Sequence, residues 1–219
     1  MKQKGFIFDL DGVIVDTAKY HFLAWKKLAE SVGVSFSEED NEHLKGVSRV
    51  RSLEKILQWG NVQLSKTKFE ELLHDKNEDY LSYVDTMTKD EILPDVPRVL
   101  YFLSENNQPM ALGSASKNAR SILKKVQLLD SFQAIVDGTN VTKAKPNPEV
   151  FLKAAEALQQ APSNCIVFED SLAGIQAANT AGMTSIGIGD ASVLQDAMYV
   201  FKDFTQISNK FLYQLISDS

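Results

Sequence analysis

Cysteine is almost absent from this sequence, and its scarcity excludes two kinds of site. The single cysteine, Cys165, cannot form an intramolecular disulfide, and it cannot supply the several thiolates of a cysteine-based zinc site. Because it lies in the apolar run 164–168, we expect its thiol to be an inert part of the core. The chemistry of the chain must therefore depend on other groups.

The sequence also lacks long hydrophobic runs and an excess of positive charge. Asp9 interrupts the first apolar stretch too early for a signal peptide, and no later stretch approaches the ~20 apolar residues of a membrane span. We therefore expect a cytoplasmic protein with no membrane partner. The net charge of −6 gives no general attraction to nucleic acid, so any phosphate site must be a local cluster of Lys and Arg.

What the chain does have is enough length for a sizeable core and a regular alternation of two patterns. Its 219 residues allow one large domain or a domain that carries an insert. Short apolar runs predict buried strands at 5–8, 109–113, 134–137, 165–168 and 184–188. Between them, helical patterns lie at about 117–128, 147–160 and 171–181. This alternation predicts an α/β fold, a Rossmann-like doubly wound parallel sheet with helices on both faces.

The first connection is too long for a simple crossover and indicates an insert. A crossover needs only a dozen or more residues, whereas residues 10–108 separate the first two predicted strands. Its interior shows only helical patterns, two of which follow Ser48 and Ser65 as expected N-caps. We therefore expect a small α-helical cap domain at 17–90, inserted into a core domain made of 1–16 and 91–219. Residues 90–97 would lead back into the core.

Acidic and hydroxyl residues follow three of the predicted strands. Asp9 and Asp11 come after the first, residues 114–116 after the second, and Glu169 and Asp170 after the strand at 165–168. In an open parallel sheet, ligands bind beyond the carboxyl ends of the strands, so we expect these residues to converge. Four crowded carboxylates repel one another unless a cation neutralises them, and oxygen ligands without His or Cys favour Mg²⁺.

Together these residue types indicate phosphoryl transfer. A metal ion screens charge while hydroxyl and backbone N–H groups hold phosphate oxygens. Lys145 fits the same site, because the stretch after it is explained as a helix start, with Asn147 as N-cap and Pro148 at the first helical position. Asp9 and Asp11 point the same way in an extended chain, so one can attack phosphorus while the other handles a hydroxyl proton.

Each of these signals also has a plain structural interpretation. An Asp-Gly pair is often only a turn, the segment 169–171 is also suited to capping the helix that follows it, and Ser116 is suited to capping the helix expected at 117–128. The joint placement of these residues at successive strand ends favours the catalytic interpretation.

The order of these motifs resembles the haloacid dehalogenase superfamily of phosphotransferases over the whole chain. The resemblance rests on residues 9–13, Ser114, the Lys145-Pro146 pair and the Glu169-Asp170 pair. It implies that Asp9 becomes an aspartyl phosphate and that Asp11 is the general acid and base. It also implies that Mg²⁺ is held by Asp9, the backbone carbonyl of Asp11, Glu169 and Asp170.

The expected cap carries its own polar candidates. Lys76 falls on the apolar stripe of its predicted helix, where an unpaired ammonium is costly, so we expect it to face an anion or a polar cleft. Thr17, His21 and Trp25 share one helix face, and Arg49 can hold a phosphate with two hydrogen bonds. The alternatives are a lysine that reaches solvent, a core tryptophan and an ordinary helix histidine.

Within the superfamily, the cap is similar to that of the β-phosphoglucomutase branch. The matching stretches are 17–22 with Trp25, 44–49 with Ser52, 76–77 and 114–118. This similarity implies a mutase that interconverts β-D-glucose 1-phosphate and D-glucose 6-phosphate through glucose 1,6-bisphosphate, acting on sugar phosphates as a monomer. The residues expected to bind phosphate or substrate are Thr17, His21, Trp25, Lys45, Gly46, Val47, Ser48, Arg49, Ser52, Lys76, Ser114, Ala115, Ser116, Lys117, Asn118 and Lys145.

The sequence departs from this branch at two places and leaves two rival functions open. Val50 and Arg51 stand where acidic residues are expected, and Gly138 stands where proline is expected. The first departure affects the expected sugar contacts, and neither affects the acids. The main rival is a sugar-phosphate phosphatase of the same superfamily, and a more remote one is a non-catalytic phosphosugar-binding regulator.

Overall fold

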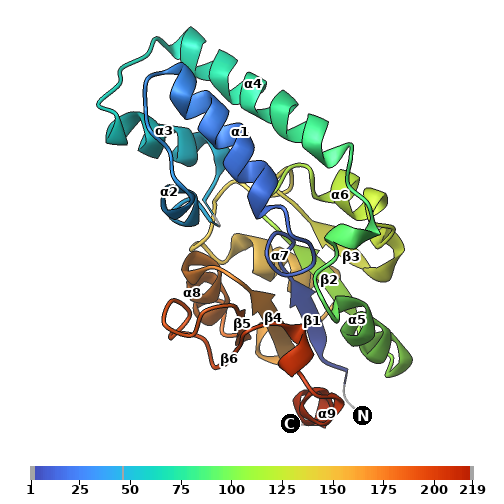
Figure 1. Ribbon diagram of the computed structural model, residues 1–219. Coiled ribbons are helices and arrows are strands. Elements are labelled where there is room, and N and C mark those ends of the chain that lie inside the picture. Colours follow the sequence, from blue (N-terminus) through green and yellow to red (C-terminus); the bar gives the residue numbers. More distant parts are fainter. Residues whose placement is uncertain (1–2, 46, 218–219) are drawn as a thin grey trace.

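The computed structural model describes residues 3–45 and 47–217. Within these residues, six strands form one parallel sheet in the order β3-β2-β1-β4-β5-β6 (Figure 1). The strands are β1 (Gly5–Phe8), β2 (Met110–Gly113), β3 (Ala134–Val136), β4 (Cys165–Glu169), β5 (Thr184–Ile188) and β6 (Tyr199–Phe201). The five expected strands and the doubly wound fold are confirmed. The short edge strand β6, whose residues are exposed or only partly buried, was missed although it lies in the apolar run 197–201.

Helices cover both faces of this sheet. Alternate residues of β1 point to opposite faces, so Phe6 and Phe8 pack in one hydrophobic cluster and Ile7 in another. The first cluster includes side chains of α5 (Val96–Glu105), α6 (Ala119–Lys125) and α9 (Asn209–Ser217). The second includes side chains of α7 (Glu149–Ala157) and α8 (Leu172–Thr180), together with Cys165, which is buried as expected.

The long insert folds as helices beyond one end of the sheet. These helices, which we call the cap helices, are α1 (Ala18–Ser31), α2 (Glu38–Glu42), α3 (Arg49–Trp59) and α4 (Lys66–Val84) (Figure 1). They enclose a hydrophobic cluster of their own around Trp25, Leu53 and Ile56. The helical insert is therefore confirmed, while its expected limits at 17 and 90 stay predictions.

The two chain segments that join the cap helices to the core run side by side. The backbone N–H of Asp16 donates to the carbonyl of Glu91 at 2.9 Å, and that of Leu93 donates to the carbonyl of Ile14 at 3.0 Å. Both ends of the insert thus lie close to the strand β1 that carries the first acids. The described residues also include four short 3₁₀ turns, at Lys89–Glu91, Leu129–Ser131, Pro162–Asn164 and Phe204–Gln206.

Several helix starts follow the expected capping chemistry. The hydroxyls of Ser48, Ser65 and Ser171 accept hydrogen bonds from backbone N–H groups in the first turns of α3, α4 and α8. The expected start of α7 is wrong by one residue, because Pro148 is its N-cap and Glu149 its first helical residue. Asn147 still contributes, since its side-chain oxygen accepts from the N–H of Glu149 at 3.1 Å.

The helix expected at 117–128 is shorter than the sequence pattern predicts. α6 begins only after its N-cap Asn118, so Ser116 does not cap it directly, although its hydroxyl accepts from the N–H of Asn118 at 3.2 Å. At its other end, Gln127 has a φ of 60°, a left-handed conformation that cannot continue a helix. The C-terminal end was predicted too far out because apolar residues continue beyond the helix, at Val126 and Leu128, and the N-terminal end because Ser116 is suited to capping.

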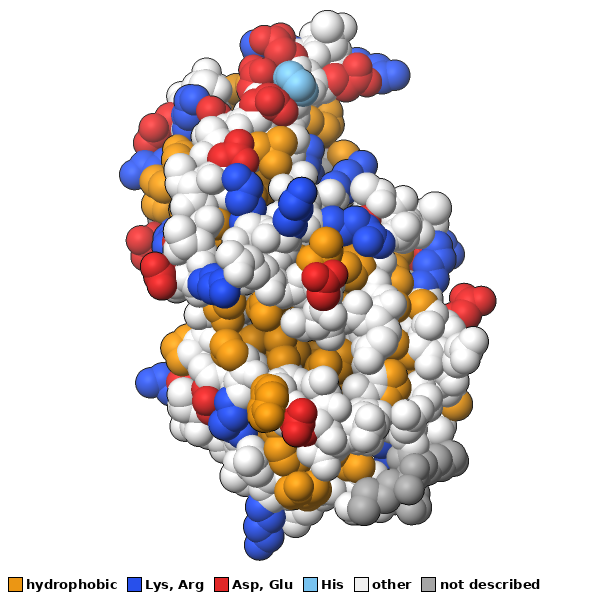
Figure 2. All heavy atoms as spheres, turned by 90° about the vertical axis from the view of Figure 1, so that its right-hand side faces the viewer, with side chains coloured by type: hydrophobic (Ala, Val, Ile, Leu, Met, Phe, Trp, Pro, Cys, Tyr) orange, Lys and Arg blue, Asp and Glu red, His pale blue; other side chains and the backbone are white. Residues whose placement is uncertain are grey.

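The surface mixes both signs of charge. Figure 2 shows Lys and Arg side chains interspersed with Asp and Glu side chains on one face, with hydrophobic side chains exposed between them over its lower half. Exposed hydrophobic residues include Tyr101 and Tyr213, on α5 and α9. No helix of the described residues has both the length and the apolar character needed to cross a membrane.

Candidate active site

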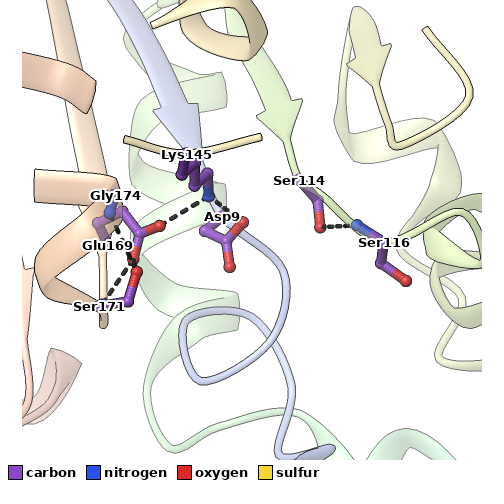
Figure 3. A network of polar contacts seen from close by, with 7 residues as sticks. All are labelled: Asp9, Ser114, Ser116, Lys145, Glu169, Ser171 and Gly174. Carbon is purple, nitrogen blue, oxygen red and sulfur yellow. Dashed lines mark hydrogen bonds and ion pairs between the residues drawn. The ribbon is translucent and has the colours of Figure 1, made fainter. Parts of the chain in front are cut away.

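The site begins where the central strands β1 and β4 end side by side. Phe8 is paired with Phe168, and the N–H of Asp9 donates to the carbonyl of Phe168 at 3.0 Å, so Asp9 and Glu169 become neighbours. The buried ammonium of Lys145 lies between their carboxylates, at 2.7 Å from each (Figure 3). Residues far apart in the sequence thus form one buried charged centre.

This centre holds more negative than positive charge. One carboxylate oxygen from each of Asp9, Glu169 and Asp170 lies within 4.8 Å of the others. Burial, followed by the repulsion of neighbouring acids, raises the pKa of Asp170 well above its usual value. Burial alone would lower the pKa of Lys145, but the charges of Asp9 and Glu169 raise it, so this lysine stays protonated.

The same donor set fits Mg²⁺. Three carboxylates with no His or Cys among them supply the oxygen ligands that this ion prefers, and their oxygens lie close enough together to share one ion. The side chain of Asp11 does not join this cluster, because it accepts a hydrogen bond from the hydroxyl of Thr17. Its expected contact with the ion through the backbone carbonyl stays a prediction.

Two glycines leave room for the acids. A Cβ on Gly12, whose φ is +77°, would lie 2.2 Å from Oδ2 of Asp170. A Cβ on Gly174 would lie 1.7 Å from Oε1 of Glu169. Sequence analysis treated Gly12 only as part of a turn and did not consider Gly174, which lies in the first turn of α8.

The side chain of Asp11 faces a polar chain from the cap helices. Its Oδ1 lies 4.0 Å from Nε2 of His21, and Nδ1 of His21 lies 3.0 Å from the ammonium of Lys76. Burial and the nearby charges of Lys76 and Arg49 lower the pKa of His21 well below its usual value, so the imidazole is neutral. A neutral ring that accepts from Lys76 at Nδ1 carries its proton on Nε2, toward Asp11.

Lys76 is buried, which excludes the alternative in which it reaches solvent. It is 3% exposed, and its ammonium lies 4.6 Å from the ring centre of Trp25 and 4.7 Å from that of Tyr80. Burial and the charge of Arg49 lower its pKa to about 7. The cap therefore holds a cationic group that an anion in the cavity would stabilise.

The loop after β2 forms another side of the site. Ser114 is buried, and its hydroxyl accepts from the backbone N–H of Ser116 at 3.1 Å (Figure 3). Ala115, Lys117 and Asn118 complete this loop. Gly138 lies against it, because a Cβ there would lie 2.2 Å from the carbonyl oxygen of Ala115.

All these groups surround one cavity of about 480 Å³ between the cap helices and the core. Of the expected site residues, Gly46 lies outside the described residues, and the buried Glu169 contacts Lys145 but does not line the cavity. The others line the cavity: Asp9, Asp11, Thr17, His21, Trp25, Lys45, Val47, Ser48, Arg49, Ser52, Lys76, Ser114, Ala115, Ser116, Lys117, Asn118, Lys145 and Asp170. The structure brings them together, and their individual roles stay predictions.

Several of these residues also have structural contacts. Trp25 belongs to the hydrophobic cluster of the cap helices, and Ser48 is an N-cap, so each combines both interpretations. Lys45 reaches from the cap toward the core acids, with its ammonium 3.8 Å from Asp170. Of the two departures after Arg49, Val50 lines the cavity, whereas Arg51 pairs with Glu54 at 2.6 Å.

Tyr80 is a lining residue that sequence analysis missed. Its ring stacks on His21 with 4.3 Å between ring centres, and its buried hydroxyl has no hydrogen-bond partner among the described residues. Its position four residues after Lys76, on the same helix face, was the available signal.

Comparisons with known proteins show the family to which the chain belongs. The model of the haloacid dehalogenase-like hydrolase family matches residues 3–182. The β-phosphoglucomutase of Bacillus subtilis (strain 168) is 42% identical over 213 residues, which cover 96% of this chain and 94% of that protein. The fructose-1-phosphate phosphatase of Escherichia coli (strain K12) is 32% identical over 187 residues, 84% of this chain and 95% of that protein.

A solved structure shows the same similarity. The crystal structure of β-phosphoglucomutase from Clostridium difficile has a TM-score of 0.93 and 40% sequence identity, and the match covers 98% of this chain and 97% of that chain. The resemblance expected from the motifs is therefore confirmed for the fold and for the sequence as a whole.

Proposed function

The chain belongs to the haloacid dehalogenase-like hydrolase family, and we propose that it is a magnesium-dependent phosphomutase. It interconverts β-D-glucose 1-phosphate and D-glucose 6-phosphate through an aspartyl phosphate and an enzyme-bound glucose 1,6-bisphosphate. One observation carries the proposal: a single cavity is lined by acids from the end of the sheet and by cations from the cap. The acids can transfer one phosphoryl group while the cations hold the phosphate at the other end of a bisphosphate.

Asp9 is the nucleophile in this reaction. One of its carboxylate oxygens attacks a phosphorus of the bisphosphate, the bond from that phosphorus to the sugar oxygen breaks, and the aspartyl phosphate forms. Lys145, which stays charged beside Asp9 and Glu169, stabilises negative charge on the phosphoryl oxygens. Mg²⁺, when held by the acids of this centre, would supply further screening of that charge.

Asp11 handles the proton of the sugar hydroxyl. Burial raises the pKa of Asp11, which favours the protonated acid that the departing sugar oxygen needs. In the reverse transfer, the Asp11 carboxylate accepts the proton of the other sugar hydroxyl as that oxygen attacks the aspartyl phosphate. The hydroxyl of Thr17 donates to Asp11 and holds it in the cavity, while Nε2 of His21 lies 4.0 Å from the same carboxylate oxygen.

A second phosphate site between the cap and the loop after β2 explains why a mutase is favoured over a phosphatase. A bisphosphate must be held at its non-reacting end while it turns round, and Arg49, Ser116, Lys117 and Asn118 offer that second phosphate site. A phosphatase needs only the site for the reacting phosphate. The similarity to the phosphatases of other organisms covers less of the chain at lower identity than the similarity to the Bacillus subtilis mutase.

One assay separates the two functions. Purified protein is given α- or β-glucose 1-phosphate, with Mg²⁺ and with or without glucose 1,6-bisphosphate as primer. The mutase proposal expects glucose 6-phosphate from the β anomer, accelerated by the primer, with little inorganic phosphate. Release of inorganic phosphate without glucose 6-phosphate would instead establish a phosphatase. If neither product forms, the phosphosugar-binding regulator is the remaining alternative.

The proposal extends to the setting of the enzyme. We propose that it acts as a monomer in the cytoplasm, on small sugar phosphates and without nucleic acid or membrane partners. Size-exclusion chromatography with light scattering tests the monomer, for which the expected mass is that of one chain of 24.4 kDa.

A further inference from the structure

Asn77 connects the two sides of the cavity. It lies on α4, next to Lys76, and its side-chain oxygen accepts two hydrogen bonds. One comes from Nη2 of Arg49 at 2.6 Å and the other from Nδ2 of Asn118 at 3.2 Å. Arg49 begins the cap helix α3, whereas Asn118 precedes the core helix α6. A single carboxamide therefore touches both elements that offer groups to the second phosphate site.

The chemistry of the partners fixes the direction of these bonds. A guanidinium can only donate, so the atom of Asn77 that faces Arg49 must be its carboxamide oxygen. That same oxygen can accept from Asn118 only if Asn118 presents its NH₂ group. The contact thus sets the orientation of both partners, which line the cavity.

A neutral partner sets Arg49 apart from the other arginines of the chain. Arg49 forms no ion pair with any acid in the described part of the chain, and it is half-buried. Each of the other three has an acidic partner within 4.0 Å: Arg51 with Glu54, Arg98 with Asp95 and Arg120 with Asp137. The charge of Arg49 is therefore not neutralised by the described residues and is left for an anionic ligand.

We infer that Asn77 is a positioning residue of the site for the non-reacting phosphate, an inference that rests on the proposed mutase function. Its oxygen orients the Arg49 guanidinium and the Asn118 carboxamide without adding charge. An aspartate at this position would have nearly the same shape, but it would pair with Arg49 and repel a phosphate dianion. The neutrality of Asn77 is the property that recognition of the second phosphate requires.

The direct test is Asn77→Asp, compared with Asn77→Ala and with the charge control Gln58→Glu. Gln58 is exposed on α3 and does not line the cavity, so its substitution adds the same charge elsewhere on the Arg49 helix. Calorimetry measures the binding of glucose 6-phosphate, and kinetics measure KM and kcat of the mutase reaction. We expect Asn77→Asp to raise Kd and KM by about tenfold or more. Asn77→Ala should raise them about two- to fivefold, and Gln58→Glu should match the wild type.

A double-mutant cycle with Arg49→Ala separates positioning from a general effect on the fold. If Asn77 acts through Arg49, the loss caused by the uncharged Asn77→Ala substitution largely disappears when the guanidinium is absent. An equal loss in both backgrounds would overturn the inference, and so would an Asn77→Asp protein that binds glucose 6-phosphate as tightly as Gln58→Glu. Thermal melting checks that each variant is folded. If Asn77→Asp is unfolded, the double-mutant cycle with Asn77→Ala decides.

Failure of the proposed function would look different. The wild-type protein would then form no glucose 6-phosphate from β-glucose 1-phosphate. The binding measurements with glucose 6-phosphate would still show whether Asn77 positions Arg49.

Discussion

The buried charges around Lys145 in the core and the two cap cations Lys76 and Arg49 are stabilised in opposite ways. In the core, Lys145 lies 2.7 Å from both Asp9 and Glu169, so buried charges of opposite sign hold one another. In the cap, the cationic groups of Lys76 and Arg49 have a neutral imidazole and a neutral carboxamide as their hydrogen-bond partners. The core therefore carries its own partial neutralisation, whereas the cap depends on an anion that enters the cavity.

This difference predicts which substitutions destroy the chemistry and which weaken only substrate binding. Changes to the core acids should act on every phosphoryl transfer. Changes to the cap cations should act mainly on substrates with a second phosphate. Substitutions on both sides of the cavity test that contrast.

The largest effect is expected from Asp9→Asn. An amide is a poor nucleophile toward phosphorus, and it also weakens the proposed metal site, so turnover should be abolished. The coupled assay of glucose 6-phosphate formation measures this loss, and circular dichroism checks that the variant is folded. Mutase activity retained by the folded Asp9→Asn variant would defeat the assignment of the nucleophile.

Asp11→Asn should act on proton transfer rather than on the metal. If Mg²⁺ contacts only the backbone carbonyl of residue 11, metal affinity should be largely kept while turnover slows by ~10²–10⁴-fold. A Mg²⁺ titration of activity gives both quantities from one experiment. A variant that loses metal affinity but turns over normally at saturating Mg²⁺ would show that the role of Asp11 is wrong.

Arg49 tests the cap side of the comparison. Charge-assisted hydrogen bonds contribute ~1.5–3 kcal/mol each, so Arg49→Ala should lower the mutase kcat/KM by roughly tenfold to more than a hundredfold. Arg49→Lys keeps the charge but loses the fork of N–H groups, so it should also weaken use of sugar phosphates.

Acetyl phosphate provides the matching readout for the core. It lacks a second phosphate, so phosphoryl transfer from it to Asp9 should fall much less in the Arg49 variants than the mutase reaction does. Equal losses in both reactions would mean that Arg49 supports the fold or the core chemistry. No loss in either would favour the phosphatase.

The effect with the least consequence for the reaction is a change in the pH dependence of stability. Burial and the charge of Arg49 lower the pKa of Lys76 to about 7, whereas in the unfolded chain its pKa is close to 10.5. Between these values the unfolded state binds more protons, so this lysine makes the ligand-free protein more stable as pH rises from about 7 to about 10. His21, Asp11 and Tyr80 also surround this ammonium.

Lys76→Met removes this contribution. Relative to the wild type, it should stabilise the ligand-free protein near pH 7 by an amount on the order of a few kcal/mol, and the difference should shrink toward pH 10. Urea unfolding of both proteins at several pH values measures it. A difference that stays constant with pH would show that Lys76 does not titrate in this range.

Sequence patterns predicted the core centre more completely than the cap. Asp9, Lys145 and Glu169 follow strands or precede a helix, so the general rule for parallel sheets was enough to bring them together. Asn77 and Tyr80 carry no such signal, because a polar or aromatic residue on a helix stripe is equally consistent with solvent or core contacts. The start of α7 and the ends of α6 were missed for a related reason, since apolar spacing does not report local backbone angles.

The sequence by itself determined the fold class, the helical insert and the order of the acids, because these depend on hydrophobic periodicity and on rules for strand ends. Only the tertiary structure decided which charges have partners. It placed Lys145 between two carboxylates and gave Arg49 the neutral oxygen of Asn77 in place of an acid. Pairing of side chains depends on distances and desolvation between residues far apart in the chain, and a linear pattern contains neither.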